Sequence, residues 1–270
     1  MTVTEGRPDL IVNAISCYYS QTYKNKELVV VSQGTVFENS IIRELVECVE
    51  GAFFVDAPSN LSLGAMRNLS IELTTGDIIC QWDDDDFYHP QRLMSQYKRL
   101  RGRSVACLYT QHLKYFKDKN QMYWIDYKRG TDDYVSVAKR CPYKKFLTGS
   151  VMFLKDCFYQ YKNNLYPEWN CEEDLDVLQK LMKLGSVEEV NDGHQYVYVF
   201  HDGNTYDRHH HEMVFHKKHI FTSDELLERR FLLEDSCDKM GLRQIDFCTS
   251  PIVDFDKDDQ LGTMVAFTSS

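Results

Sequence analysis

The chain has 270 residues, of which 43% are hydrophobic and 27% are charged, as expected for a folded globular protein with a sizeable core. Its net charge of −10 argues against a broad surface for nucleic-acid phosphates. No apolar stretch approaches the ~20 residues that cross a bilayer, so we expect no transmembrane segment. The N-terminal residues lack a signal-peptide pattern, and the nine cysteines contain no CxxC pair, so we expect reduced thiols in a cytoplasmic protein.

The first hundred residues alternate between strand-like and helix-like segments. The expected strands are 27–34, 52–58 and 77–82, and the expected helices are 39–49, 63–77 and one that starts at His89-Pro90. This β-α-β-α-β-α order predicts a parallel sheet with helices on its faces.

The second half begins with strand patterns and ends with helical ones. Strands are expected at 104–110 and 121–127, and the leucine spacing of 171–185 predicts a helix. A strand near residue 200 leads into a His-rich loop. Thr222 and Glu225 have the spacing of a capping box, so a further helix is expected over 222–241, followed by a strap or loose tail.

Four consecutive aspartates, 83–86, follow the expected strand 77–82. Ligands bind outside the carboxyl ends of the strands in such sheets. Asp83 and Asp85 suit a hard divalent cation, and because alternate residues of an extended chain point apart, one can hold the metal while the other takes a ribose hydroxyl. Position and composition leave a solvated acidic turn open as the alternative.

Four segments, taken in order, resemble family 2 glycosyltransferases with the GT-A fold: "QTYKNKELVVVSQGT", "LGAMRNLSIELTTGDIICQWDDDDFYHPQRL", "LTGSVMFLKDCF" and "NCEEDLDVLQKL". The resemblance runs from about residue 7 to about residue 206. It implies an α/β fold, with a mostly parallel central sheet flanked by helices and a C-terminal helix and loop extension. Residues 1–220 would form the GT-A domain, with nucleotide binding in about 1–100 and acceptor binding in about 101–220, and residues 221–270 would pack on it.

The resemblance also implies an activity, which is metal-dependent transfer of a sugar from a nucleotide-sugar donor, a UDP-sugar first, to an acceptor hydroxyl with inversion. The implied cofactor is Mn²⁺ or Mg²⁺. The implied site residues are Asp85 on the metal, Asp83 on the ribose or the metal shell, Arg67 near the nucleotide, Asp174 as catalytic base with Glu173 beside it, and Gly149 and Ser150 lining the donor-sugar and acceptor pocket. For Asp174, an ordinary acidic helix start is the alternative.

The chain departs from the family pattern in two places. Ser32, Gln33, Gly34 and Thr35 stand where the family usually has Asp-Asp-Gly-Ser. Ser32, or Gln33 as the alternative, is therefore expected to hydrogen-bond the base edge in place of an aspartate, and the expectation of uridine is weakened. The segment before the first expected turn is short, so Thr4 to Arg7 are expected to form a stunted first strand.

Seven of the nine histidines lie between His194 and His219. His211 and His216 are one residue too far apart for a zinc-protease HExxH helix, so that reading is rejected. His201 and His209 are candidate metal residues by analogy with GT-A enzymes, and a solvated polar loop is the alternative.

Two other functions stay open at this point. A sugar-phosphate nucleotidyltransferase would need a Gly-rich loop and a basic residue near the N-terminus, which are not found. A catalytically silent sugar-nucleotide or metal-binding module is favoured by Ser32 and the short N-terminal segment. The acceptor is a glycan, a lipid-linked sugar, a peptide or a small molecule. A basic segment at 143–146 would allow peripheral membrane contact.

Overall fold

The computed structural model describes residues 1–100, 104–130, 139–201, 203–204, 208, 211 and 220–249. Its N-terminal part is a parallel sheet in the order β1-β2-β3 (Thr2–Thr4, Leu28–Ser32 and Ala52–Asp56). Helices α1 (Pro8–Tyr19), α2 (Val36–Glu47) and α3 (Leu63–Leu73) follow these strands in turn. All five residues of β2 are buried, as is usual for a parallel strand covered on both faces.

A second sheet has the order β10-β6-β9-β4. Its strands are β4 (Ile78–Cys80), β6 (Ser104–Tyr109), β9 (Met152–Leu154) and β10 (Ser186–Val190). Strand β9 is antiparallel to both neighbours, whereas β10 and β6 are parallel. Helices α4 (Arg92–Arg99), α6 (Asp156–Gln160) and α7 (Glu173–Leu184) accompany this sheet.

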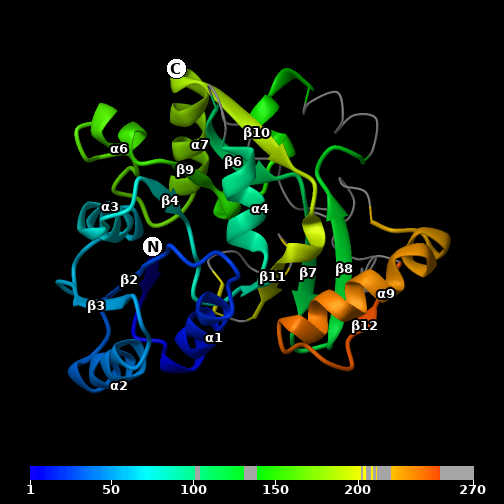
Figure 1. The fold of residues 1–270 in the computed structure, drawn as a ribbon, viewed down its shortest axis with the longest axis horizontal. Coiled ribbons are helices and arrows are strands. Elements are labelled where there is room, and N and C mark those ends of the chain that lie inside the picture. The colour runs from blue at the N-terminus through cyan, green and yellow to red at the C-terminus, as the bar shows by residue number, and fades with distance from the viewer. Residues whose placement is uncertain are drawn as a thin grey trace, which may run out of the picture.

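The end of β4 joins the two sheets. The backbone N–H of Trp82 donates to the carbonyl of Met1 at 3.0 Å, and the hydroxyl of Thr2 donates to the carbonyl of Trp82 at 2.7 Å. The strands therefore form one mostly parallel layer, ordered β3-β2-β1-β4-β9-β6-β10, with β1 and β4 side by side at its centre (Figure 1).

A third sheet has the order β12-β8-β7-β11-β5. Its strands are β5 (Phe87–Tyr88), β7 (Gln111–Phe116), β8 (Gln121–Asp126), β11 (Tyr196–Phe200) and β12 (Asp246–Phe247). Short 3-10 turns lie at Pro142–Lys145, Thr148–Ser150 and Gly193–Gln195.

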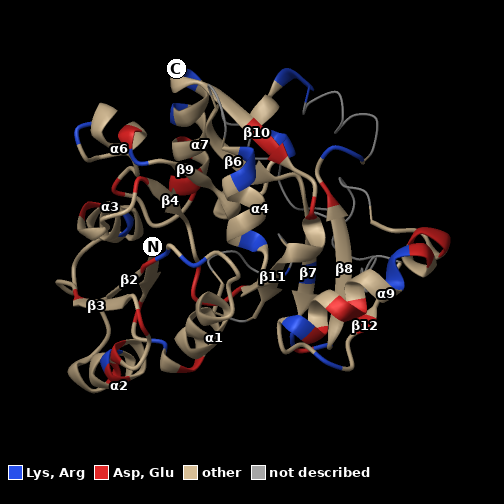
Figure 2. Cartoon of the chain, viewed as in Figure 1, with Lys and Arg blue, Asp and Glu red and all other residues tan. Residues whose placement is uncertain are grey.

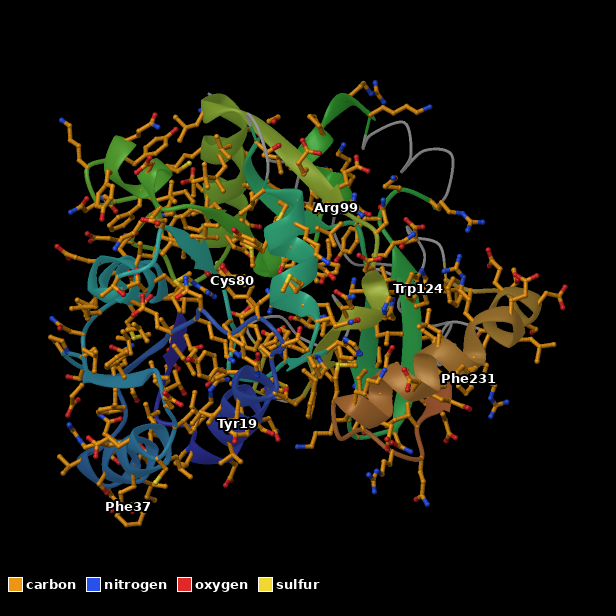
Figure 3. All side chains as sticks on the ribbon, in the orientation of Figure 1. Tyr19, Phe37, Cys80, Arg99, Trp124 and Phe231 are labelled. Atoms are coloured by element: carbon orange, nitrogen blue, oxygen red, sulfur yellow. The ribbon has the colours of Figure 1, made fainter. Side chains whose placement is uncertain are left out.

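Helix α9 (Ser223–Lys239) covers this third sheet. Phe221, just before the helix, stacks on Trp124 of β8 at 4.7 Å between ring centroids, and Leu233 joins the same cluster. The outer face of α9 carries interspersed acidic and basic residues (Figure 2), and Phe231 projects from it with 83% of its surface exposed (Figure 3).

The structure confirms the expected strands within a residue or two and corrects several helix boundaries. Helix α3 ends at Leu73, because Thr74 is extended and the N–H groups of Thr75 and Gly76 bind the Glu27 carboxylate instead. Helix α4 begins at Arg92, so the prediction of a start at His89-Pro90 was wrong. The backbone N–H of His89 is bound to the carbonyl of Gln195, outside any helix.

Near the N-terminus the prediction was also wrong. The first strand is Thr2–Thr4, whereas Thr4 to Arg7 were expected to form it. The amphipathic helix α1, which buries Ile11, Ala14 and Ile15, was not predicted at all. Helix α2 starts three residues earlier than expected, because Thr35 and Glu38 form a capping box.

All nine cysteines fall within the described residues and have free thiols. Among the described helices, none combines the length and the apolar character needed to span a membrane.

Candidate active site

A pocket of about 380 Å³ opens beyond the carboxyl end of β4. Its walls come from segments far apart in the chain, and they include Arg7, Arg67, Asp83 to Asp86, Lys114, Thr148, Gly149, Glu172 to Asp174, Tyr198 and Asn204. The pocket therefore lies at the sheet edge where the sequence predicted a site.

Asp83 is held by two side chains. Arg67 Nη1 donates to Oδ1 at 3.0 Å, and the side-chain amide of Gln81 lies 3.2 Å from both carboxylate oxygens. A Cβ atom added to Gly149 would stand 3.0 Å from Oδ2 of Asp83, so the glycine allows this carboxylate to approach the backbone closely. Asp83 is fixed in orientation before any ligand arrives.

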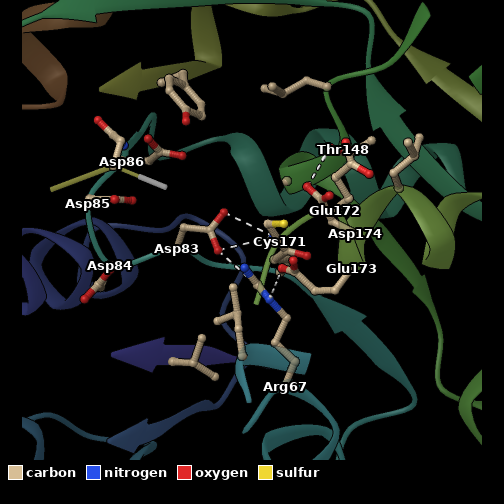
Figure 4. Close-up of a pocket in the computed structure, with 18 of the residues that line it drawn as sticks. Arg67, Asp83, Asp84, Asp85, Asp86, Thr148, Cys171, Glu172, Glu173 and Asp174 are labelled. Atoms are coloured by element: carbon tan, nitrogen blue, oxygen red, sulfur yellow. Dashed lines mark hydrogen bonds and ion pairs between the residues drawn. The ribbon is translucent and has the colours of Figure 1, made fainter. Parts of the chain in front are cut away.

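Arg67 links this aspartate to helix α7. Its Nε atom donates to Glu173 Oε1 at 3.1 Å, so the guanidinium bridges two carboxylates (Figure 4). Burial opposes its charge, but the charges of Asp83 and Glu173 outweigh burial and raise the pKa of Arg67. Arg67 therefore remains a fixed cation on the floor of the pocket.

Asp84 and Asp86 turn away from the pocket centre into internal contacts (Figure 4). Asp84 is paired with Arg7, whose Nε donates to Oδ2 at 3.2 Å, and Asp86 accepts hydrogen bonds from the hydroxyl of Tyr196 at 2.7 Å and the backbone N–H of Val199 at 2.9 Å. Both are nearly fully buried, and burial raises the pKa of Asp84 to about 7 and that of Asp86 well above its usual range. These two aspartates shape the turn.

Asp85 differs from its neighbours. In the described part of the chain its side-chain partners are His201 Nε2 at 3.2 Å and, more distantly, Arg7 Nη1 at 3.8 Å. It is the aspartate of the four that is best placed to receive a cation. Mg²⁺ and Mn²⁺ are commonly bound by one or two carboxylates together with substrate phosphates and water. No group of three or more His, Cys, Asp or Glu side chains forms a ready-made metal site within the described residues.

His201 lies at the end of β11, next to Asp85. The backbone N–H of Gly203 donates to its Nδ1 at 3.0 Å, which leaves the ring proton on Nε2, facing Asp85. Direct ligation of a metal by Nε2 would move that proton to Nδ1 and break the Gly203 hydrogen bond. In this arrangement His201 orients Asp85.

Asp174, the expected base, lies in the first turn of α7 and lines the pocket. The hydroxyl of Thr148 donates to its Oδ2 at 2.5 Å. Burial raises the pKa of Asp174, while the Thr148 hydrogen bond and the charge of Arg67 oppose that change. The carboxylate is thus a stronger base than an exposed aspartate.

Other predicted residues are not brought into the pocket. Ser32 is fully buried, and its hydroxyl donates to Asn39 Oδ1 at 2.6 Å. Ser150 is also buried, donates to the carbonyl of Leu147 and accepts from the backbone N–H of Tyr109, so it supports the turn that carries Gly149. His209 lies outside the described residues.

Several positioning residues were missed by the sequence reasoning. Asn68, next to Arg67, donates to the carbonyl of Tyr166 at 2.7 Å and accepts from its backbone N–H at 2.9 Å. Gln81, besides holding Asp83, accepts from the Tyr166 hydroxyl at 2.8 Å. Gln81 is a buried polar residue directly after the apolar strand β4, and a polar residue at such a place is the sequence signal by which this role could have been found.

Comparisons with known proteins show the family and the fold of the chain. Residues 2–164 match the family model described as "Glycosyl transferase family 2". The amylovoran biosynthesis glycosyltransferase AmsB of Erwinia amylovora is 29% identical over 103 residues, which cover 34% of this chain and 33% of AmsB, so the chain matches about a third of that relative.

Solved structures show the same fold. The mannosyltransferase PcManGT from Pyrobaculum calidifontis, in complex with GDP-Man and Mn²⁺, has a TM-score of 0.54 at 15% identity, covering 79% of this chain and 59% of its own. Residues 1–349 of S. aureus TarS, in complex with UDP-GlcNAc, have a TM-score of 0.56 at 14% identity, covering 88% of this chain and 70% of that one. The fold is GT-A, with its mixed sheet flanked by helices, and the chain belongs to glycosyl transferase family 2.

Proposed function

We propose that this protein transfers a sugar from a nucleotide-sugar donor to an acceptor hydroxyl with inversion, in a reaction that depends on Mn²⁺ or Mg²⁺. The observation that carries the proposal is that the four aspartates have different partners. Asp83, Asp84 and Asp86 are bound to Arg67, Arg7 and Tyr196, whereas Asp85 is left facing the pocket for a cation. A solvated acidic turn would not have buried its carboxylates in this way.

The donor is proposed to lie between Asp85 and Arg67. Asp85 would hold the divalent cation, which would supply positive charge to offset the charge that develops on the diphosphate leaving group. Asp83, held by Arg67 and Gln81, is positioned to accept a hydrogen bond from a donor hydroxyl. A UDP-sugar is the first candidate, and similar folds hold UDP-GlcNAc and GDP-Man.

Asp174 is the proposed general base. As the acceptor oxygen attacks the anomeric carbon, its proton passes to an Asp174 oxygen and the bond from that carbon to the diphosphate breaks, so the nucleoside diphosphate leaves with the electron pair. Attack from the face opposite the leaving group inverts the configuration. Thr148 fixes the carboxylate, and Glu173 acts on it only indirectly, by holding Arg67.

The base assignment is tested with Asp174→Asn. We expect transfer to fall by at least a hundredfold while nucleotide affinity stays within a few-fold, because the amide keeps the shape of the side chain but cannot accept the proton. The matched control is Asp176→Asn, two residues further along α7 and outside the pocket lining. Full activity in Asp174→Asn would refute the assignment.

The metal assignment is tested with Asp85→Ala. We expect Mn²⁺-dependent binding of a nucleoside diphosphate to be lost, as measured by titration calorimetry with and without the metal. Asp77→Ala removes an exposed carboxylate at the opposite end of β4 and serves as the control. If nucleoside diphosphate binding depended on Mn²⁺ equally in wild type and Asp85→Ala, the metal assignment of Asp85 would be refuted.

A further inference from the structure

The pocket has a second, basic end. His112 and Lys114 of β7, Tyr127 just after β8, Tyr198 of β11 and His211 all line it, and we call these five residues the basic recess. Lys114 and Tyr198 are register partners on adjacent strands, and ring contacts of 5.4 to 5.6 Å join His112 to Tyr127 and Tyr198 to His211. None of these residues has a role in the proposed transfer step.

Lys114 is the unusual member of the basic recess. Only 4% of the residue is exposed, although it carries an ammonium group. Within the described residues its Nζ has one hydrogen-bond partner, His211 Nδ1 at 2.7 Å, and no ion pair, while the ring of Tyr198 lies 5.0 Å away. An ammonium has three N–H donors, so the contact with His211 leaves donors of Lys114 for a ligand.

The described side chains around Lys114 do not neutralise the positive charge of its ammonium group. The carboxylate whose charge acts on it is Asp86, and both oxygens of Asp86 are already engaged by Tyr196 and Val199. Among the described residues, the other members of the basic recess are the imidazoles of His112 and His211 and the phenols of Tyr127 and Tyr198, none of which is a carboxylate. Burial lowers the pKa of Lys114 to about 7, and Asp86 opposes that change.

A buried cation that forms no ion pair is costly, and an incoming anion would relieve that cost. The Tyr198 hydroxyl adds a hydrogen-bond donor, because burial and the nearby Asp86 raise its pKa well above the usual range and keep it protonated. The pocket therefore has an end that suits a cation, at Asp85, and an end that suits an anion, at Lys114.

We propose that the basic recess binds an anionic group of the sugar acceptor, a phosphate ester or a carboxylate. This identification rests on the proposed transferase function. The acceptor is favoured over the donor because the recess is built by the β12-β8-β7-β11-β5 sheet, whereas Arg67, Asp83 and Asp85, which are proposed to hold the donor, come from the segments around β4.

The first arm of the test needs no substrate. Inorganic sulfate keeps its charge between pH 6 and pH 9 and stands in for the anionic group. Its affinity is measured by titration calorimetry at constant ionic strength for wild type, Lys114→Met and the control Lys128→Met, which removes a half-exposed lysine outside the pocket lining. We expect at least a tenfold loss of sulfate affinity in Lys114→Met and no change in Lys128→Met.

A proton readout separates binding at Lys114 from binding elsewhere. Burial lowers the pKa of Lys114 to about 7, so sulfate binding should draw protons into the wild type near neutral pH, and this uptake should be smaller in Lys114→Met, seen by repeating the titration in buffers of different ionisation enthalpy. Sulfate affinity should fall as the pH rises above 7. Sulfate binding that is equal in wild type and Lys114→Met would overturn the anion site.

The second arm identifies the source of the anion. Binding of UDP with Mn²⁺ is compared in wild type and Lys114→Met. Equal affinities support the acceptor, because the donor diphosphate then makes no use of Lys114. A tenfold loss would show that the donor occupies the recess and would overturn the acceptor assignment. If wild type binds no nucleoside diphosphate, the transferase proposal fails, and the sulfate arm still decides whether the recess is an anion site.

Discussion

The four adjacent aspartates, 83 to 86, have different partners in the folded protein. Arg67 and Gln81 hold Asp83, Arg7 holds Asp84, and Tyr196 with the Val199 N–H holds Asp86. The pattern explains why a run of like charges is tolerated, since each carboxylate but Asp85 has a strong partner inside the protein. Of the four carboxylates, that of Asp85 has the weakest partners within the described part of the protein.

A pH profile tests the surroundings of Asp174. A base works in its ionised form, so kcat/KM should fall as the pH drops through the pKa of Asp174, which burial raises above its usual range. The Thr148 hydrogen bond lowers that pKa, so Thr148→Val should raise it and move the acidic limb of the profile to higher pH. Thr148→Ser keeps the hydroxyl and should leave the limb in place. An unmoved limb in Thr148→Val would contradict a catalytic role for this pair.

At the scale of elements, helix α3 and the segment before α7 are bound to one another. The backbone N–H of Gly64 donates to the carbonyl of Trp169 at 3.0 Å, and that of Leu63 donates to Asn170 Oδ1 at 3.0 Å. Asn68 adds its pair of hydrogen bonds to Tyr166. These contacts bring Arg67 on α3 within reach of Glu173 on α7, although 106 residues separate them.

Gly64→Ala tests this junction. A Cβ at position 64 would lie 1.7 Å from the carbonyl oxygen of Pro167, so the segment must move away from α3. We expect a loss of about 1–3 kcal/mol in the free energy of unfolding, measured by urea denaturation, together with reduced transfer. Gly76→Ala is the control, because its Cβ would meet nothing closer than 3.6 Å, and it should change stability by less than about 0.5 kcal/mol. Equal stabilities of the two variants would argue against the junction.

At the scale of the molecule, the pocket lies between the layer that contains β4 and the sheet of β7, β8 and β11. Helix α3 carries Arg67, the segment after β4 carries the aspartates, and the sheet of β7, β8 and β11 carries most of the basic recess. Figure 1 shows β4 and the sheet of β7, β8 and β11 in different parts of the fold. Binding of a nucleotide and a cation at such a boundary should stabilise both parts together.

A thermal-shift series with UDP, GDP, CDP and dTDP, each with and without Mn²⁺, measures this effect. A ligand at about 100 times its Kd adds about 2.7 kcal/mol to the free energy of unfolding, which corresponds to roughly 5–10 °C in Tm for a chain of this size. We expect one base to give the largest shift and the shift to require Mn²⁺. Absence of any shift in the wild type would favour a silent binding module over the transferase.

The sequence by itself determined most of the alternating strands and helices between residues 27 and 100 and the edge of the sheet at which the pocket lies. Strands such as β2 and helices such as α7 are marked by local apolar spacing, and the family resemblance pointed to Arg67, Asp83, Asp85 and Asp174, all of which line the pocket. Boundaries set by distant partners were less predictable. Helix α3 ends early because Glu27, nearly fifty residues away, binds the backbone beyond it.

Only the tertiary structure decided which polar and charged side chains face the pocket and which are bound to other parts of the protein. Ser32 and Ser150 have the right residue type for ligand contacts, but Asn39 and the backbone around Leu147 take up their hydroxyls. Lys114 looks like any strand lysine in the sequence, and it becomes a buried cation only because β11 and His211 close over it. His211 lies 97 positions along the chain from Lys114, and for this reason no local pattern of the chain encodes the burial of this lysine.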